Sequence, residues 1–330
     1  MKRIIRKTVK ILLPFVLGSA ILYWMYRDFD FRGMWRFMEK EMVWTWMWLS
    51  FPFGILAQAF RGWRWQLTLE PIGEKPRTST SVNSIFLSYA VSLLVPRIGE
   101  FMRCGVLNQK DGVSFPKALG TVVVERMVDS VLILMITAVT LLLEMRLFGI
   151  FFEKTGVNLC DFLGRFTATG YIVTAVCGIA ALTSLYFVRK KLSFYDKVKA
   201  TTQGVMEGLM SLRQVKSIPL FLLYSMAIWA CYFLHYYLTF FCFDFTKDLG
   251  VMCALVTFIV GSIAVIVPTP NGAGPWHFAV KTMLILYGVA DINALYFVLI
   301  VHTVQTLLVV ALGVYSWVAL SMTNPKKQIP

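Results

Sequence analysis

Charged residues are scarce in this sequence of 330 residues. Asp, Glu, Lys and Arg make up 15% of the chain, whereas hydrophobic residues make up 58%. In a water-soluble domain about a quarter of the residues are normally charged. This shortage of charge excludes an ordinary soluble fold, and the sequence therefore predicts an integral membrane protein.

Motifs for nucleotide, metal and disulfide chemistry are absent from the sequence. It contains no GxxxxGK run and no HExxH pattern, and its three histidines, His235, His277 and His302, are widely separated. The six cysteines show no CxxC spacing and mostly lie in apolar stretches, where Cys behaves as a small hydrophobic residue. We therefore expect no metal, no cofactor and no disulfide framework.

Long apolar stretches are abundant instead. Those that reach the roughly 20 residues needed to cross the hydrocarbon core are Thr8–Tyr26, Val43–Phe60, Lys117–Leu143, Ala168–Val188, Ile218–Phe243 and Leu295–Met322. They are too long for core strands, and the alternation of a membrane barrel is absent, so helices must satisfy the backbone hydrogen bonds. The predicted fold is an all-α integral membrane protein, a polytopic helical bundle with about six full spans.

The distribution of Lys and Arg predicts the orientation in the membrane. With the N-terminus in the cytoplasm, most of the 32 basic residues lie on the cytoplasmic side, including Arg61 and Arg64 after the second span. Trp63 and Trp65 at the same place fit an aromatic belt. The net charge of +14 then matches anionic lipid head groups and does not indicate nucleic-acid binding. We expect a multi-pass protein of the bacterial inner (plasma) membrane with both termini in the cytoplasm.

Two further apolar stretches are too short for full spans. Val82–Val95 has about 14 residues and precedes PRIGEFMR at 96–103, and Val251–Val267 precedes the turn-rich segment Pro268–Pro275. We expect two re-entrant hairpins, the first entering from the cytoplasm and the second from outside. Their broken helix ends would leave backbone N–H groups free to bind an anion. For Pro268–Pro275, the alternative is an extracellular loop between two short spans.

The hairpins divide the chain into two oppositely oriented repeats. The expected segments are an N-terminal membrane helix with an external loop (1–42), a first repeat of span, hairpin and span (43–143), a connecting span with a cytoplasmic amphipathic helix (144–217), a second, inverted repeat (218–322) and a cytoplasmic tail (323–330). Gly- or Pro-interrupted segments in two inverted halves are typical of a transporter whose binding site lies near the membrane midplane.

Three charged residues lie inside the apolar span Lys117–Leu143. In VERMVDSVLIL, Glu125 and Asp129 are four apart and share a helix face, while Arg126 lies three before Asp129 and can pair with it. Each such charge costs about 2.5 to 3.5 kcal/mol at the middle of a membrane helix, so the three require polar partners or a water-filled cavity. They form either part of a substrate path or a buried brace between this helix and the first hairpin.

The first hairpin carries the natural partners of these charges, Arg97, Glu100 and Arg103. Guanidinium groups match phosphate oxygens, so Arg97 and Arg103 are candidate ligands for a phosphate-bearing lipid head group. The alternatives are that they balance the carboxylates or extend to the membrane interface. Lys281 of the second hairpin lies either near the interface or facing the cavity.

Three motifs, RIGEFMR, ERMVD and PTPNGAG, in this order and spacing, resemble the flippase-like membrane domain of lysylphosphatidylglycerol synthases and of stand-alone members of that superfamily. The resemblance covers roughly Val43 to Ser321. The positions that match the family's motifs are Arg97, Gly99, Glu100, Arg103, Glu125, Arg126, Asp129, Pro268, Pro270, Gly272 and Gly274. Asn271 stands where a further glycine is expected, and Asn tolerates a left-handed backbone. His277 stands where an acid is common; it either titrates near neutral pH or is a neutral hydrogen-bonding residue.

The resemblance implies a flippase-like lipid transporter, which moves a phospholipid or lipid-linked head group between leaflets. Its expected partners are that substrate, the membrane lipids and a separate lipid-modifying enzyme. The candidate substrate-binding or transport residues are those of the motifs together with Asn271, His277 and Lys281. The alternatives are a membrane-embedded transferase with Glu125 or Asp129 as general base, and a non-catalytic membrane partner of a lipid-modifying enzyme. We expect no aminoacyltransferase domain, because the polar connections are too short for one, and this favours a protein that is not an enzyme.

Overall fold

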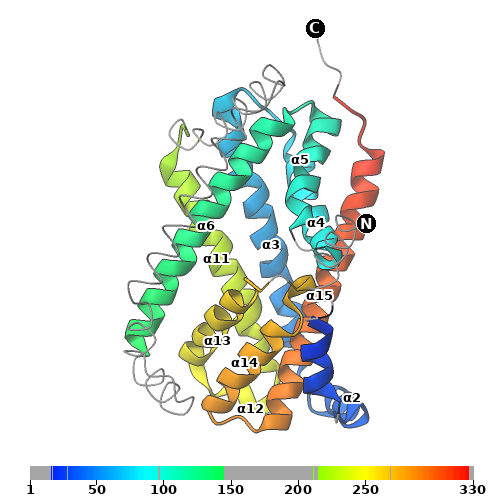
Figure 1. Cartoon of the computed structure of the whole chain (residues 1–330), viewed down its shortest axis with the longest axis vertical. Coiled ribbons are helices and arrows are strands. Elements are labelled where there is room, and N and C mark those ends of the chain that lie inside the picture. Colours follow the sequence, from blue (N-terminus) through cyan, green and yellow to red (C-terminus); the bar gives the residue numbers. More distant parts are fainter. Residues whose placement is uncertain are drawn as a thin grey trace, which may run out of the picture. The chain divides into compact units, whose positions relative to one another are not determined.

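The computed structural model describes residues 16–144 apart from 17, 28 and 96, residue 211, and residues 215–326 apart from 268. Within this part of the chain every regular element is a helix, which confirms the predicted all-α class (Figure 1). The elements are α2 (Phe31–Lys40), α3 (Trp44–Leu69), η1 (Glu70–Ile72), α4 (Thr78–Leu94), α5 (Ile98–Asp111), α6 (Phe115–Leu143), α11 (Ile218–Tyr237), η3 (Leu238–Cys242), α12 (Asp244–Lys247), α13 (Gly250–Ala264), η4 (Pro270–Gly272), α14 (Pro275–Leu286) and α15 (Asp291–Met322). Residues 18–26 are also helical. The expected span Ala168–Val188 and the amphipathic helix of 144–217 lie outside the described residues.

Three of the described helices are long and apolar enough to cross a membrane. They are α6, α11 continued by η3, and α15, and each coincides with a predicted span. The protein is therefore a multi-pass membrane protein. Helix α3 starts at Trp44 but continues beyond the predicted end at Phe60 to Leu69. By its internal contacts the chain divides into two compact units, and the first, Met1–Ile136 with Gly204–Pro330, contains the helix bundle and the candidate site.

Helices α4 and α5 form a first helical hairpin, where the sequence predicts one. At its open end, Arg77 immediately before α4 forms a 2.6 Å ion pair through Nε with Asp111, the last residue of α5. At its closed end, Gly99 lies so close to the Ser88 carbonyl oxygen that a Cβ atom at this position would clash with it. Arg97 turns the chain between the two helices with a left-handed backbone, φ 65°. The two helices therefore run antiparallel around a tight turn.

Helices α13 and α14 form a second helical hairpin, again at the predicted place. Gly261 on α13 permits close contact with Trp276 on α14, since a Cβ atom at Gly261 would lie 2.7 Å from the indole nitrogen. The connection contains η4, in which Asn271 and Gly272 have φ angles of 53° and 67°. The prediction that Asn271 accepts a left-handed conformation is confirmed.

Both hairpins pack against helix α15, and they approach it from opposite ends. At its C-terminal end, the Lys110 ammonium of the first hairpin donates to the Thr323 carbonyl oxygen at 2.9 Å. At its N-terminal end, Lys281 of the second hairpin forms a 2.8 Å ion pair with Asp291. The open ends of the two hairpins are thus separated by the full length of α15.

The closed ends of the hairpins meet near the middle of α15. The Asn271 side-chain amide donates to the Thr306 hydroxyl at 2.6 Å, and the Asn271 carbonyl oxygen accepts from Nε2 of His302 at 3.1 Å. From the other side, Ala90 near the end of α4 lies against Gly313, where a Cβ atom would clash with it. The turn η4 also contacts α4 directly (Figure 1).

The segment expected to be an external loop contains a helix, α2. The Asp30 carboxylate caps it by accepting hydrogen bonds from two backbone N–H groups of the first turn, at 3.0 and 2.9 Å. One face packs against the hydrophobic core through residues that include Phe37, while Phe31 and Trp35 are exposed. The helix has 10 residues, too short for a span, and span length alone therefore predicts a loop at this place.

The close packing of α3 against α4 at Gly62 can be tested by adding a side chain at this position. A Cβ atom at Gly62 would lie 2.9 Å from the backbone Cα of Val82, whereas one at Gly105 of α5 would meet nothing within 4 Å. We expect Gly62→Val to lower the free energy of unfolding by roughly 1 to 3 kcal/mol, as overpacking does. Gly105→Val is the matched control. Thermal unfolding of both variants in detergent measures the difference, and equal melting temperatures would contradict the close contact.

Candidate functional site

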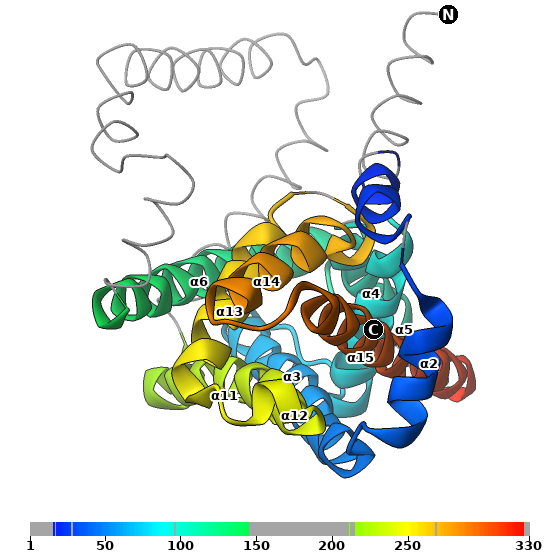
Figure 2. The ribbon, with the colours of Figure 1, turned by 90° about the horizontal axis from the view of Figure 1, so that it is seen from below.

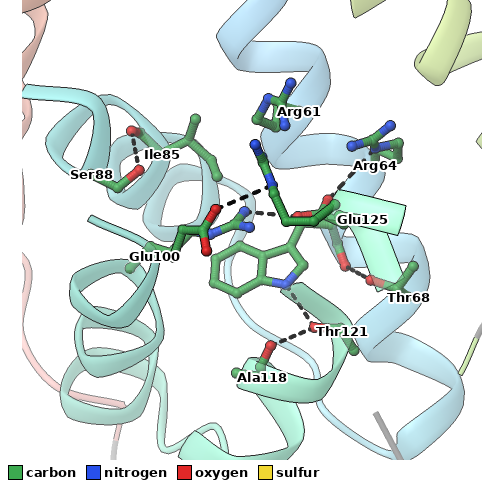
Figure 3. Close-up of polar contacts among 12 residues, drawn as sticks. Arg61, Arg64, Thr68, Ile85, Ser88, Glu100, Ala118, Thr121 and Glu125 are labelled. Atoms are coloured by element: carbon green, nitrogen blue, oxygen red, sulfur yellow. Dashed lines mark hydrogen bonds and ion pairs between the residues drawn. The ribbon is translucent and has the colours of Figure 1, made fainter. Parts of the chain in front are cut away.

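A cluster of charged side chains is buried between α3, α5 and α6. We define the charge cluster as the four arginines and three carboxylates that are linked there by ion pairs: Arg61, Arg64, Glu100, Arg103, Glu125, Arg126 and Asp129. Figure 3 shows Arg64 of α3 beside Glu125 of α6, with Arg61 on the same helix and Glu100 of α5 on the opposite side.

Asp129 is the carboxylate that joins α3 to α6. Its two oxygens pair with Nη1 of Arg61 at 2.6 Å and with Nη1 of Arg64 at 2.8 Å. Arg126, three residues earlier on α6, approaches the same carboxylate through Nη2 at 3.6 Å. The predicted pairing of Arg126 with Asp129 is therefore present, although the two shortest contacts of Asp129 come from α3.

Glu125 joins the first hairpin to the same helix pair. Its Oε2 forms a 2.8 Å ion pair with Nη1 of Arg103, and its Oε1 lies 3.6 Å from Nε of Arg64. A second link between α5 and α6 is the 3.3 Å contact between Nε of Arg126 and Glu100. Glu125 and Arg64 are completely buried, whereas Arg126 is half-exposed. The cluster thus has a fully buried centre and a more exposed edge.

Aromatic rings enclose the cluster. The guanidinium of Arg103 lies 4.5 Å from the centre of the Trp65 ring, and that of Arg61 lies 5.9 Å from the rings of Tyr89 and Tyr232. The hydroxyl groups of the two tyrosines are hydrogen-bonded to each other at 3.0 Å. Cations are attracted to the faces of aromatic rings, so these contacts partly replace the hydration that the guanidinium groups lose on burial.

The cluster has more positive than negative charge. Four guanidinium groups face three carboxylates within it, which leaves one positive charge in excess. Nη2 of Arg64 and Nε and Nη2 of Arg103 are buried and have no hydrogen-bond partner among the described residues. Buried N–H groups are normally satisfied. An anion with several oxygens would accept hydrogen bonds from such donors and offset the excess charge.

The structure brings together most of the charged residues predicted for the first repeat. Glu100, Arg103, Glu125, Arg126 and Asp129 all belong to the charge cluster. Arg97 does not: it is exposed at the turn of the first hairpin and forms no ion pair within the described part of the chain. Gly99 next to it serves packing, because any side chain at this position would clash with α4.

The sequence does not predict the burial of two arginines of the cluster. Arg61 and Arg64 are expected among the cytoplasmic cations at the end of the second span, and the structure buries both on α3. Trp65, expected in an aromatic belt, is also buried and lies against Arg103. A signal was present, because the two arginines are three residues apart and so share one face of a helix that continues past Phe60.

The residues predicted for the second repeat form a separate, uncharged group. Around the Asn271 contacts with Thr306 and His302, the rings of His277 and His302 lie 4.4 Å apart. Nδ1 of His277 accepts a hydrogen bond from the Gly274 backbone N–H at 3.4 Å. These residues hold the turn of the second hairpin on α15 and have no ion pair with the charge cluster.

The remaining predicted residues lie outside the charge cluster. Pro270 and Gly272 belong to η4, and Pro268 lies outside the described residues. Lys281 lies in the middle of α14, is paired with Asp291 at the start of α15, and has no ion pair with the charge cluster. Among the described residues, no group of three or more His, Cys, Asp or Glu side chains is placed to hold a metal ion.

The fold and the charge cluster define a multi-pass helical membrane protein with an ion-pair network in its interior. The chain belongs to the family described as lysylphosphatidylglycerol synthase TM region, whose model matches residues 11–313. This confirms the family predicted from the sequence, and the match includes both hairpins and the cluster. Membership of the family indicates a role connected with membrane lipids. No curated protein and no solved structure shows significant similarity to the chain.

The burial of Glu125 predicts a large effect of removing its charge. Glu125→Gln leaves Arg103 buried without a counter-charge, so we expect a loss of roughly 3 to 5 kcal/mol in the free energy of unfolding. Glu100→Gln makes the same chemical change at the more exposed edge of the cluster, and we expect a loss below about 1 kcal/mol there. Denaturant unfolding in detergent measures both values. Equal losses for the two variants would show that the interior of the cluster is hydrated.

Proposed function

We propose that this protein moves a phospholipid or a lipid-linked head group between the leaflets of a membrane. The observation that carries the proposal is the excess positive charge of the buried charge cluster. A charge inside a membrane helix costs about 2.5 to 3.5 kcal/mol on insertion scales, so a buried arginine without a counter-charge destabilises the protein in the membrane. A head-group phosphate would offset that charge and satisfy the free N–H groups of Arg64 and Arg103.

The arrangement of the hairpins on α15 supports a site at the middle of the membrane. With 32 residues, α15 is about 48 Å long, more than the roughly 30 Å of the hydrocarbon core. His302 and Thr306, which hold the second hairpin, lie near the middle of this helix. If α15 spans the bilayer, both hairpins are re-entrant and their turns meet at mid-depth, as in transporters with inverted repeats.

Arg97 is the residue that we assign to first contact with the phosphate. It is exposed at the turn of the first hairpin, and its left-handed backbone is a conformation that residues other than glycine rarely adopt. Backbone strain of this kind is often found at functional sites. The phosphate would pass from Arg97 toward Arg103, six residues further along the chain on α5.

Arg126 is suited to a change of partner during transport. It is half-exposed and lies between two carboxylates, with contacts of 3.3 Å to Glu100 and 3.6 Å to Asp129. Neither contact is as short as the 2.6 Å pair between Arg61 and Asp129. An arriving phosphate competes for the Arg126 guanidinium, and its departure restores the contacts with the carboxylates.

Charge at the open end of the first hairpin supports a cytoplasmic location for this end. Lys75, Arg77 and Lys110 lie there, and Lys326 near the C-terminus donates to the Lys75 carbonyl oxygen at 3.2 Å. The positive-inside rule places such a group on the cytoplasmic side. We therefore propose a bacterial inner membrane protein with cytoplasmic termini, in which the first hairpin opens inward and the second outward.

Removal of the Arg97 side chain tests the proposal without adding backbone strain. Glycine adopts positive φ readily, so Arg97→Gly should fold as the parent does. Loss of one charge-assisted hydrogen bond, about 1.5 to 3 kcal/mol, should slow transbilayer exchange of a fluorescent phospholipid roughly ten- to hundredfold. The measurement is the rate at which a reductant added outside vesicles bleaches lipid that began in the inner leaflet.

Lys75→Ala is the control for that experiment, because Lys75 is an exposed cation at the opposite end of the same hairpin. Its exchange rate should equal that of the parent. A fluorescent diacylglycerol, which lacks phosphate, should show no dependence on Arg97. Unchanged phospholipid exchange in Arg97→Gly would contradict the role of Arg97 in transport.

A further inference from the structure

A polar cleft lies at the end of the bundle where α2, α12 and the start of α15 come together. Figure 2 looks onto this end, which is the lower end in Figure 1. The cleft has a volume of about 590 Å³, within the usual range of small-molecule sites, and shares no lining residue with the charge cluster. Arg36, Lys40, Glu41 and Asp244 are its charged lining residues.

Three of these four charges are available to a ligand. Asp244 is paired with Lys247 at 2.9 Å. Arg36 uses only its Nε, which donates to a backbone carbonyl oxygen one turn earlier at 3.4 Å. Lys40 and Glu41, like Arg36, form no ion pair with any described residue. All three side chains are exposed, so the cleft offers a ligand two hydrated cations and one hydrated carboxylate that are not engaged in ion pairs.

Aromatic side chains line the same cleft. The ring of Phe37 lies 5.9 Å from that of Phe245 and 5.4 Å from that of Tyr296. The Tyr296 hydroxyl has no hydrogen-bond partner among the described residues. A Cβ atom at Gly33 would lie 3.0 Å from this hydroxyl oxygen, so the glycine allows α2 to approach it. Aromatic faces beside a carboxylate such as Glu41 attract an amine or ammonium group.

The beginning of α15 adds hydrogen-bond donors. Asn293, in its first turn, lines the cleft. Its side-chain amide can donate a hydrogen bond to a ligand. The first turn of α15 also holds Asp291, whose carboxylate is paired with Lys281, so the helix start itself is not counted as an anion site.

We propose that this cleft binds a head group that carries both a phosphate and an amine. The phosphate contacts Arg36, Lys40 and the Asn293 amide, and the amine contacts Glu41 and the aromatic rings. A ligand that carries both charges can pair with Arg36, Lys40 and Glu41 at once, whereas a purely anionic or purely cationic ligand pairs with residues of one sign and places the other sign close to a like charge. The inference goes beyond the proposed function, because binding here requires no transport.

The surface of α2 favours a ligand carried by a lipid. Phe31 and Trp35 are exposed on this helix, which also carries the basic residues Arg32, Arg36 and Lys40. A helix with exposed aromatic rings on one side and cations on the other is typical of the membrane interface. The cleft would then lie at the level of the head groups.

Binding to the purified full-length protein in detergent tests the inference. The probes are dihexanoylphosphatidylethanolamine and free phosphoethanolamine, and isothermal titration calorimetry measures the dissociation constants. Arg36→Gln should weaken binding of both probes at least tenfold, because the phosphate loses a guanidinium partner. Glu41→Gln should do the same, because the amine loses its carboxylate.

Matched controls lie on the same helix outside the cleft. Arg32→Gln and Glu39→Gln make the same chemical changes at exposed positions and should alter the dissociation constants less than twofold. Tighter binding of the lipid than of free phosphoethanolamine assigns the site to lipid, and equal binding assigns it to the soluble compound; both support the head-group chemistry. Equal affinity for dihexanoylphosphatidylglycerol or glycerol 3-phosphate, which lack the amine, would overturn the inference. So would equal affinity of all four variants for the two probes.

Discussion

The ion pairs of Glu125 and Asp129 are the interaction on which the packing of α3, α5 and α6 depends. Helix α6 carries both carboxylates within an apolar sequence, and neither can remain charged in the membrane without a buried partner. Arg61 and Arg64 bring α3 to this helix, and Arg103 brings the first hairpin. The charges that would destabilise each helix alone therefore determine how the three helices pack together.

The two hairpins meet on α15 but differ in chemistry. The first belongs to a network of charges, whereas the second is held by neutral groups, with Asn271 bonded to Thr306 and His302. This asymmetry suits a protein in which one hairpin binds an anion while the other closes the path. The contacts of Asn271 can break and re-form without exposing an unpaired charge, so movement of the second hairpin costs less than movement of the first.

Much of this arrangement could be predicted from local sequence. Both hairpins follow from apolar segments too short to span a membrane and interrupted by Pro or Gly, and the family follows from three motifs in order. The burial of Arg61 and Arg64 could not be predicted in this way. The positive-inside rule counts every arginine near the end of a span as a residue of the adjoining loop. Helix α3 instead continues to Leu69 and buries both side chains. Lys281 could not be placed either, since its partner Asp291 belongs to the next helix. The cleft beside α2 depends on side chains from three distant segments, which no local pattern connects.

The depth of the two hairpin turns tests the central claim most directly. Single cysteines introduced as Arg97→Cys and Ala273→Cys in a background without native cysteines would be labelled in vesicles with a membrane-impermeant maleimide from each side. We expect both to react much more slowly than Lys75→Cys, which lies at an open hairpin end, and to be protected by added phospholipid. Rapid labelling of positions 97 and 273 from opposite sides, without such protection, would show that the turns lie at separate surfaces and share no path for a lipid.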